Sequence, residues 1–251
     1  MSNTALRSHP STVCHDRTYR AKIHRGNYAT FHVAVEQTDL LITADRDLKD
    51  LVLKSVYAYR RQIEEYITYR PVFFESLTPI DVDPVAPPII REMEDASRVA
   101  GVGPMAAVAG AIAQYVGMDL VGMSDTVIVE NGGDIFIHSP RNETRVGIFA
   151  GDSPLSYKVS LKIQSEKTPL CVCTSSGTVG HSLSFGQADA VCVISKSGAL
   201  ADAAATSLGN MVKGEGDIRH ALDRGSTIEG VLGIVIIVND KLGAWGDVEL
   251  V

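Results

Sequence analysis

The sequence has few cysteines and no long apolar run, and both shortages exclude whole classes of protein. Cysteine occurs only at Cys14, Cys171, Cys173 and Cys192, too few and too irregularly spaced for a disulfide framework or a structural zinc site. The most apolar stretch, residues 230–238, has nine residues, whereas a membrane-spanning helix needs roughly 20. We therefore expect reduced thiols and no membrane partner.

Basic residues are also in the minority. The chain carries 23 Lys and Arg against 30 Asp and Glu, which gives a net charge of -7. A broad attraction to phosphate backbones or anionic lipid requires a basic surface, so nucleic acid is not expected as a partner. Residues 1–14 have Ser, Thr, His and Pro where a secretory signal needs an unbroken apolar stretch, so we expect a cytoplasmic protein.

Strand patterns occur at the start and throughout the second half of the chain. Residues 18–43 alternate apolar and polar side chains around a predicted Gly26-Asn27 turn, which favours a meander opening over a Rossmann start. Further strands are predicted within residues 126–130, 135–138, 145–149, 157–163, 170–173, 190–194 and 231–238. The many short strands and hairpin turns predict a sheet-rich protein.

Helical patterns occupy the stretches between these strands. Residues 47–69 have apolar side chains at i, i+3 and i+4 and end before Pro71, and shorter helices are predicted at 89–100 and 200–211. Residues 105–116 are apolar on nearly all sides, which indicates a helix packed inside the molecule. Residues 77–88 contain four prolines and predict an extended segment, interpreted as a crossing between two lobes.

The first candidate binding motif is the run Asn131-Gly132-Gly133-Asp134. Its two glycines allow the main chain to approach a ligand, and the Asp134 carboxylate can accept hydrogen bonds from that ligand. Asn-Gly is also the commonest hairpin turn, so by itself the motif favours a plain turn.

The second candidate is a hydroxyl- and glycine-rich loop, residues 173–180, that follows a predicted strand. Its core is the run Thr174-Ser175-Ser176-Gly177, whose amides and hydroxyls can bind a diphosphate without a basic surface. The Lys and spacing of a P-loop are missing, so an ordinary solvated loop is the alternative. His181 follows the loop directly and is a candidate general base or phosphate ligand, although most lone loop histidines are neither.

The third candidate is the pair Asp202 and Thr206 in an alanine-rich predicted helix. Their spacing of four puts both oxygens on one helix face. Such a pair suits Mg²⁺, which takes one or two carboxylates and completes its shell with water and phosphate oxygens. The alternative is an Asp favoured by a helix N-terminus next to a buried Thr.

These motifs gain weight from their order along the chain. A Gly/Ala-rich helix is followed in turn by residues 130–134, 174–177 and 201–206. The ApbE superfamily has its motifs in the same order, and this sequence resembles that superfamily over about residues 101–210. The resemblance implies an α+β, T-fold-like architecture with mixed, largely antiparallel sheets, packed helices and two lobes. It also implies a single domain over residues 1–251, with the lobe crossing near 77–88. It is greatest to a cytosolic ApbE-like branch.

The resemblance also implies roles for the motif residues. The best-known members are FAD:protein FMN transferases, which use Mg²⁺ to cleave the FAD diphosphate and attach FMN to a protein threonine. Asp202 and Thr206 match the metal-binding pair, residues 131–134 the flavin-side glycine turn, and residues 174–177 the Thr-Ser-Gly segment. The transferase Lys is missing from residues 103–107, and the His segment is shortened around His181, so transfer to an exported protein is not expected.

Three functions follow as expectations. The first is an FAD- or FMN-binding protein with Mg²⁺, with transfer of FMN to a protein acceptor as its candidate reaction. The second, implied by the cytosolic branch, is an accessory protein or partner in sulfide assimilation to homocysteine and methionine, in which Cys171, Cys173 and Cys192 serve as thiols. The third is a catalytically silent interaction module.

Overall fold

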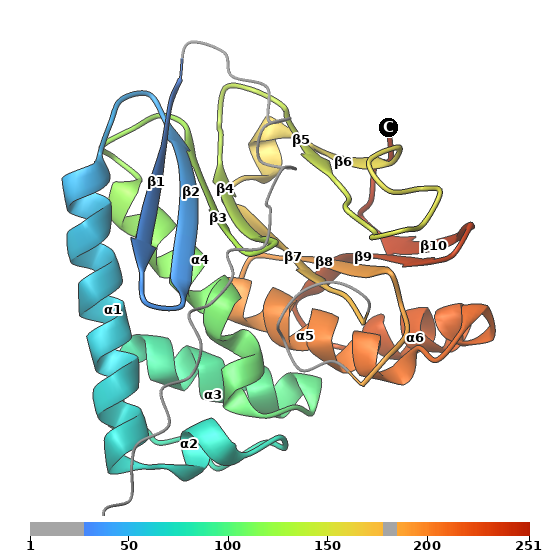
Figure 1. The fold of residues 1–251 in the computed structure, drawn as a ribbon, viewed down its shortest axis with the longest axis horizontal. Helices are drawn as coiled ribbons and strands as arrows, with labels where there is room; N and C mark the ends of the chain where they lie inside the picture. The colour runs from blue at the N-terminus through green and yellow to red at the C-terminus, as the bar shows by residue number, and fades with distance from the viewer. Residues whose placement is uncertain (1–27, 178–184) are drawn as a thin grey trace, which may run out of the picture.

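The computed structural model describes residues 28–177 and 185–251, and Figure 1 shows how its elements are arranged. The elements in chain order are β1 (Ala29–Val35), β2 (Thr38–Ala44), α1 (Lys49–Tyr69), α2 (Val72–Glu75), α3 (Pro88–Ala100), the 3-10 helix η2 (Pro104–Ala107), α4 (Val108–Leu120), β3 (Val127–Asn131), β4 (Asp134–His138), β5 (Thr144–Gly147), β6 (Ser160–Ile163), η3 (Ser165–Lys167), β7 (Leu170–Ser175), β8 (Ala190–Ser195), α5 (Gly198–Met211), η4 (Glu215–Asp217), α6 (Ile218–Gly225), β9 (Val231–Val238) and β10 (Lys241–Gly246).

Eight of the strands form one antiparallel sheet. Its order is β1-β2-β3-β4-β7-β8-β9-β10. The chain leaves this sheet after β2 for the helices α1 to α4, after β4 for the separate β5–β6 pair, and after β8 for α5 and α6. Helices α4, α5 and α6 lie against one face of this sheet, and β5–β6 lie on its other side (Figure 1). This architecture confirms the predicted α+β fold with a largely antiparallel sheet and packed helices.

The central strands have apolar side chains on both faces because both faces are covered. Side chains alternate across a strand. On β7, Cys171 and Cys173 therefore join the large core under the helices, whereas Leu170 and Val172 join a second core on the β5–β6 side. Double coverage explains why β7, β8 and β9 form continuous apolar runs with no polar alternation.

The predicted helices are present, with adjusted ends. The amphipathic helix of residues 47–69 is α1, and the all-apolar helix of residues 105–116 is α4, which starts three residues later, after η2, and runs on to Leu120. The predicted strand 157–163 is shorter, because only Ser160–Ile163 pairs with β5. The first predicted strand and the Gly26-Asn27 turn lie outside the described residues.

The proline-rich segment has no helix or strand between α2 and the start of α3. Its function as a crossing between two lobes stays a prediction. Within the described part of the chain, no single helix is long and apolar enough to cross a membrane, although the bent pair Pro88–Ala100 and Pro104–Leu120 passes by length and composition alone.

Candidate functional site

Asp202 reaches from α5 to the first turn of the neighbouring helix α4. Its Oδ2 atom accepts hydrogen bonds from the main-chain N–H groups of Ala109, at 3.1 Å, and Gly110, at 2.9 Å. The first N–H groups of a helix have no partner within the helix, and the N-cap residue of α4 supplies no side-chain hydrogen bond. Asp202 therefore caps α4 from outside, at the end where the helix dipole favours negative charge.

Two glycines allow α4 and α5 to come this close. A Cβ atom on Gly110 would lie 2.2 Å from the Gly198 carbonyl oxygen and 2.8 Å from the Asp202 Cβ. A Cβ atom on Gly198 would likewise lie 2.4 Å from the Gly110 carbonyl oxygen. Because nonbonded carbon atoms prefer separations of roughly 3.5 Å or more, only glycine fits at either position.

The glycine turn between β3 and β4 joins the same place. Gly132 and Gly133 have φ values of 68° and 115°, the left-handed region that glycine adopts without strain. The Asn131 Nδ2 atom donates to the Ala109 carbonyl oxygen at 3.0 Å, which ties the turn to the start of α4. Asp134 begins β4, and its Oδ1 atom accepts from the Thr174 N–H at 3.3 Å. The turn is thus both a hairpin turn and a link between α4 and β7.

Both aspartates have a raised affinity for a proton. Burial raises the pKa of Asp202 to about 7, although the hydrogen bonds from Gly110 and Ala109 oppose this shift. Burial, and then the charge of Asp202, raise the pKa of Asp134 well above its ordinary value, although the Cys173 thiol and the Thr174 N–H stabilise its charged form. Two carboxylates close together in a desolvated place bind a proton or a cation more readily than exposed ones do.

The hydroxyl-rich run lies at the end of β7. Thr174 and Ser175 still belong to the strand, and the Thr174 hydroxyl donates to the Cys192 sulfur at 3.2 Å. The Gly177 N–H donates to the Ala188 carbonyl oxygen at 2.9 Å, which fixes where the chain leaves the strand. The Thr174 carbonyl oxygen lies 3.8 Å from the position of a Cβ on Gly133, so the loop start and the glycine turn are neighbours.

The structure therefore joins three of the predicted segments through direct contacts. Asp202, Asn131 and the start of α4 meet at Ala109, and Asp134 links this group to Thr174. Thr206 lies one turn after Asp202 on the same face of α5 and is half-buried. His181 lies outside the described residues, so its role stays a prediction.

Sequence reasoning missed the main-chain groups of Ala109 and Gly110. Amides have no side-chain signature, and the only signal was the glycine at position 110 within an apolar helix. The Cys173 contribution to Asp134 was also missed, because sequence reasoning favoured buried packing for this thiol over metal or redox chemistry and gave it no polar partner.

The thiols expected to matter in sulfur chemistry are inaccessible. Cys171, Cys173 and Cys192 are all buried, and burial raises the pKa of each thiol, for Cys192 to about 11. The thiolate is the reactive form, so a raised pKa makes a thiol inert near neutral pH.

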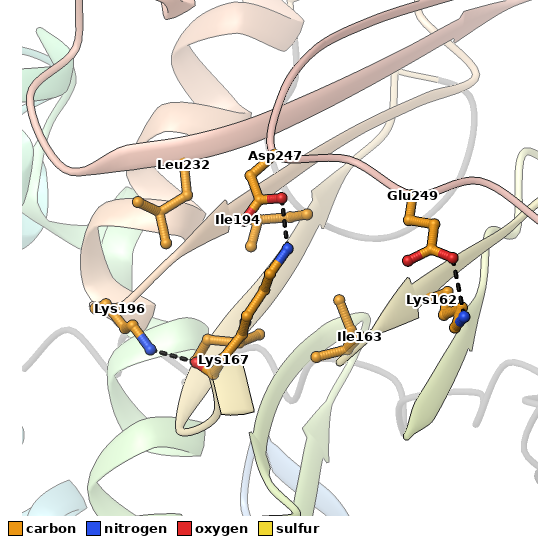
Figure 2. Close-up of a pocket in the computed structure, with 9 residues that line it drawn as sticks. Lys162, Ile163, Lys167, Ile194, Lys196, Leu232, Asp247 and Glu249 are labelled. Atoms are coloured by element: carbon orange, nitrogen blue, oxygen red, sulfur yellow. Dashed lines mark hydrogen bonds and ion pairs between the residues drawn. The ribbon is translucent and has the colours of Figure 1, made fainter. Parts of the chain in front are cut away.

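A separate cavity lies on the β5–β6 side of the sheet. It has a volume of about 120 Å³, and Figure 2 shows Lys162, Lys167 and Lys196 around an apolar floor that includes Ile163 and Ile194. Lys167 pairs with Asp247 at 2.5 Å and Lys162 with Glu249 at 2.9 Å, so these charges are compensated (Figure 2). None of the residues predicted from sequence lines this cavity.

Comparisons with known proteins found relatives that match most of the chain. A family model described as AbpE bacteria matches residues 20–250. The UPF0280 protein of Methanocaldococcus jannaschii is 40% identical over 230 residues, which cover 87% of this chain and 91% of that protein. The UPF0280 protein of Methanothrix thermoacetophila is 41% identical over 214 residues, or 83% and 87% of the two chains.

Two solved structures have a similar fold. The apo flavinyl transferase ApbE of Pseudomonas stutzeri superposes with a TM-score of 0.58 at 16% identity, covering 87% of this chain and 93% of its own. The ApbE protein of Thermotoga maritima gives a TM-score of 0.54 at 12% identity, with 86% and 96% covered. At these identities the likeness is one of fold.

Proposed function

Because the chain belongs to the family described as AbpE bacteria, we propose that it binds a flavin nucleotide, FAD or FMN, together with Mg²⁺. The cation would be held by Asp202 and Thr206 of α5, close to Asp134. The flavin diphosphate would lie against residues 174–177, with the glycine turn of residues 131–134 on the flavin side. Location in the cytoplasm is part of the same proposal.

The observation that carries this proposal is the pairing of Asp134 and Asp202. Burial raises the pKa of both carboxyl groups, and the charge of Asp202 raises that of Asp134 further, so keeping both groups ionised costs free energy. A divalent cation relieves the repulsion more effectively than a single shared proton. Asp134 of β4 and Asp202 of α5 would therefore both stabilise a bound cation, although they lie far apart in the chain.

The donor set fits Mg²⁺ and does not fit a metal that needs a full protein shell. The described residues contain no group of three or more His, Cys, Asp or Glu able to hold a metal ion. Mg²⁺ commonly takes one or two carboxylates and completes its six ligands with water and substrate phosphates. A site of this kind would hold the cation firmly only when the nucleotide is present.

Nucleotide cleavage and transfer is the finer part of the proposal. When bound, Mg²⁺ supplies charge neutralisation on the diphosphate and polarises the bond to be broken. In FMN transfer, a threonine oxygen of the acceptor protein bonds to the phosphorus on the FMN side. The P–O bond to the AMP half then breaks, AMP leaves, and the hydroxyl proton passes to a base, for which His181 is the candidate.

Isothermal titration calorimetry with FAD tests the binding proposal. We expect wild-type protein to bind FAD more tightly in Mg²⁺ than in EDTA. The Asp202→Asn variant keeps an oxygen for the Ala109 and Gly110 amides but loses the charge, so we expect it to lose the Mg²⁺ dependence. The control is Asp95→Asn on the exposed side of α3, which also removes one negative charge. The Asp95 side chain is 55% exposed, so this variant should bind FAD as wild type does.

Two outcomes contradict the proposal. One is a wild-type protein that binds neither FAD nor FMN, and the other is an Asp202→Asn variant whose affinity depends on Mg²⁺ as strongly as that of wild type. Release of AMP from FAD by the wild-type protein, with an acceptor threonine present, separates transfer from binding alone.

No observation in the structure favours the accessory function in sulfide assimilation. The three described thiols are buried, so a sulfur-assimilation partner would have to act through another part of the molecule.

A further inference from the structure

Glu92 of α3 joins the two helices that form the candidate site. Its Oε1 atom accepts from the Ser197 hydroxyl at 2.6 Å and from the Gln114 Nε2 at 3.0 Å, and its Oε2 atom lies 3.3 Å from the same nitrogen. The Tyr115 hydroxyl also donates to it. The half-buried Glu92 therefore contacts α4 through Gln114 and Tyr115, and the start of α5 through Ser197.

Ser197 and Gln114 carry the effect of Glu92 into α5. Ser197 is the N-cap of α5, and its hydroxyl oxygen accepts from the Leu200 N–H at 3.2 Å while its proton goes to Glu92. The Gln114 amide donates to Glu92 and accepts from the Gly198 N–H. Hydrogen bonds in such a chain polarise and strengthen one another, and the negative charge lies where the α5 dipole favours it.

With Gln114 opposite, the chemistry of this network suits a carboxylate at position 92. A carboxylate only accepts hydrogen bonds, so it can receive the Ser197, Gln114 and Tyr115 donors together. Among the described residues, no Lys or Arg lies within ion-pair distance of Glu92. Its charge is thus satisfied by neutral donors from the two helices that it holds together.

This network and the Asp202 contact lie on the same interface between α4 and α5. Gln114 is one turn after Gly110 on α4, and Asp202 is one turn after Gly198 on α5. Between these points the Gly110 and Gly198 backbones touch. A shift of either helix at the Gln114 end therefore moves Asp202 relative to the Ala109 and Gly110 amides at the other end.

We propose that Glu92 is a positioning residue, which fixes α5 against α4 and so holds the Asp202 carboxylate on the amides of α4. Its effect on ligand binding rests on the proposed function, whereas its effect on the Asp202 contact does not. Residues that orient ligands of a metal from outside typically change metal affinity by about 10- to 100-fold when they are replaced.

Three variants of the full-length protein test this proposal. In Glu92→Gln, an NH₂ group replaces one carboxylate oxygen next to the Gln114 amide. If Gln114 keeps its orientation, its NH₂ group faces the new NH₂ group. If Gln114 flips, its NH₂ group faces the Gly198 N–H instead, so two donors meet in either orientation. Adding Gln114→Glu exchanges the two side chains and restores every hydrogen bond from Ser197, Gly198 and the amide. Asp95→Asn, on the exposed face of the same helix, is the control for loss of a negative charge.

The first measurement needs no ligand. Amide hydrogen exchange followed by NMR reports whether the Ala109 and Gly110 N–H groups are hydrogen-bonded. We expect both to exchange at least about tenfold faster in Glu92→Gln and to return to near wild-type rates in the exchanged double variant. The second measurement is the FAD affinity in Mg²⁺, expected to weaken about tenfold and to recover in the same double variant.

The outcomes separate the two proposals. Unchanged exchange at Ala109 and Gly110 in Glu92→Gln overturns the positioning role, whatever happens to affinity. Faster exchange with unchanged FAD affinity also overturns it, because Glu92 is then only structural. If wild type binds no FAD, the proposed function fails, and the exchange data alone decide whether Glu92 holds Asp202 in place.

Discussion

Gly110→Ala is a sharp perturbation of the α4–α5 interface. The added Cβ would lie 2.2 Å from the Gly198 carbonyl oxygen and 2.8 Å from the Asp202 Cβ. A comfortable separation is about 3.5 Å, so the two helices must separate by on the order of 1 Å. This movement stretches the bonds from Asp202 to the α4 amides, now 3.1 and 2.9 Å, beyond useful length.

The expected cost follows from three effects. Overpacking a well-filled contact costs ~1–3 kcal/mol, and each hydrogen bond to a charged group that is lost costs ~1.5–3 kcal/mol. Ala is the better helix former by up to ~1 kcal/mol, which offsets part of this loss. The low ends of these ranges together give a net destabilisation of at least about 3 kcal/mol, which lowers Tm by at least roughly 6 °C for a domain of this size.

Thermal and urea unfolding followed by circular dichroism measure this change. The matched control is Gly216→Ala, because a Cβ on Gly216 meets nothing within 4 Å and its stability should stay within about 0.5 kcal/mol of wild type. Gly198→Ala should resemble Gly110→Ala, since its Cβ meets the Gly110 carbonyl oxygen at 2.4 Å. If Gly110→Ala is as stable as the control, the close contact that positions Asp202 is not as described.

Three further predictions concern other groups. In EDTA, the unfolding free energy should fall as pH rises from about 4 to about 7, because the pKa of Asp202 is higher in the folded state, which therefore holds the extra proton. Urea titrations of Asp202→Asn should show a flatter pH dependence than wild type. An equal slope in the two proteins would contradict the assignment. Glu94→Ala should lose about 3–5 kcal/mol, because the fully buried Glu94 pairs with Arg70 at 3.0 Å, whereas Glu65→Ala, at a site 65% exposed, should change thermal unfolding little. In a Cys14→Ser variant, no thiol should react rapidly with a disulfide reagent at pH 8 until denaturant is added, and a fast native reaction would show that the buried cysteines are accessible.

Local patterns in the sequence were sufficient for the elements and for the motif residues. The periodicity of α1 and the apolar composition of α4 predicted both helices, because a side-chain pattern is fixed by the geometry of the element that it covers. The hairpin at residues 131–134 followed from its two glycines, since few other residues adopt positive φ. The spacing of Asp202 and Thr206 likewise placed both on one helix face.

What Asp202 contacts was not predictable from those patterns. One reading of the sequence allowed an Asp favoured by a helix N-terminus, but the N-terminus concerned belongs to α4, more than 90 residues earlier in the chain. The Glu92 network is equally non-local, because Glu92, Gln114 and Ser197 come from three helices.

The sequence by itself thus determined the α+β composition, the helices, most strands and the identity of the polar residues available for chemistry. Only the tertiary structure decided that Asp134 and Asp202 share one desolvated place and that main-chain amides contribute to it. The reason is physical: secondary structure follows from side-chain periodicity within a segment, whereas a pKa shift or a helix capped from outside depends on packing between segments far apart in the chain.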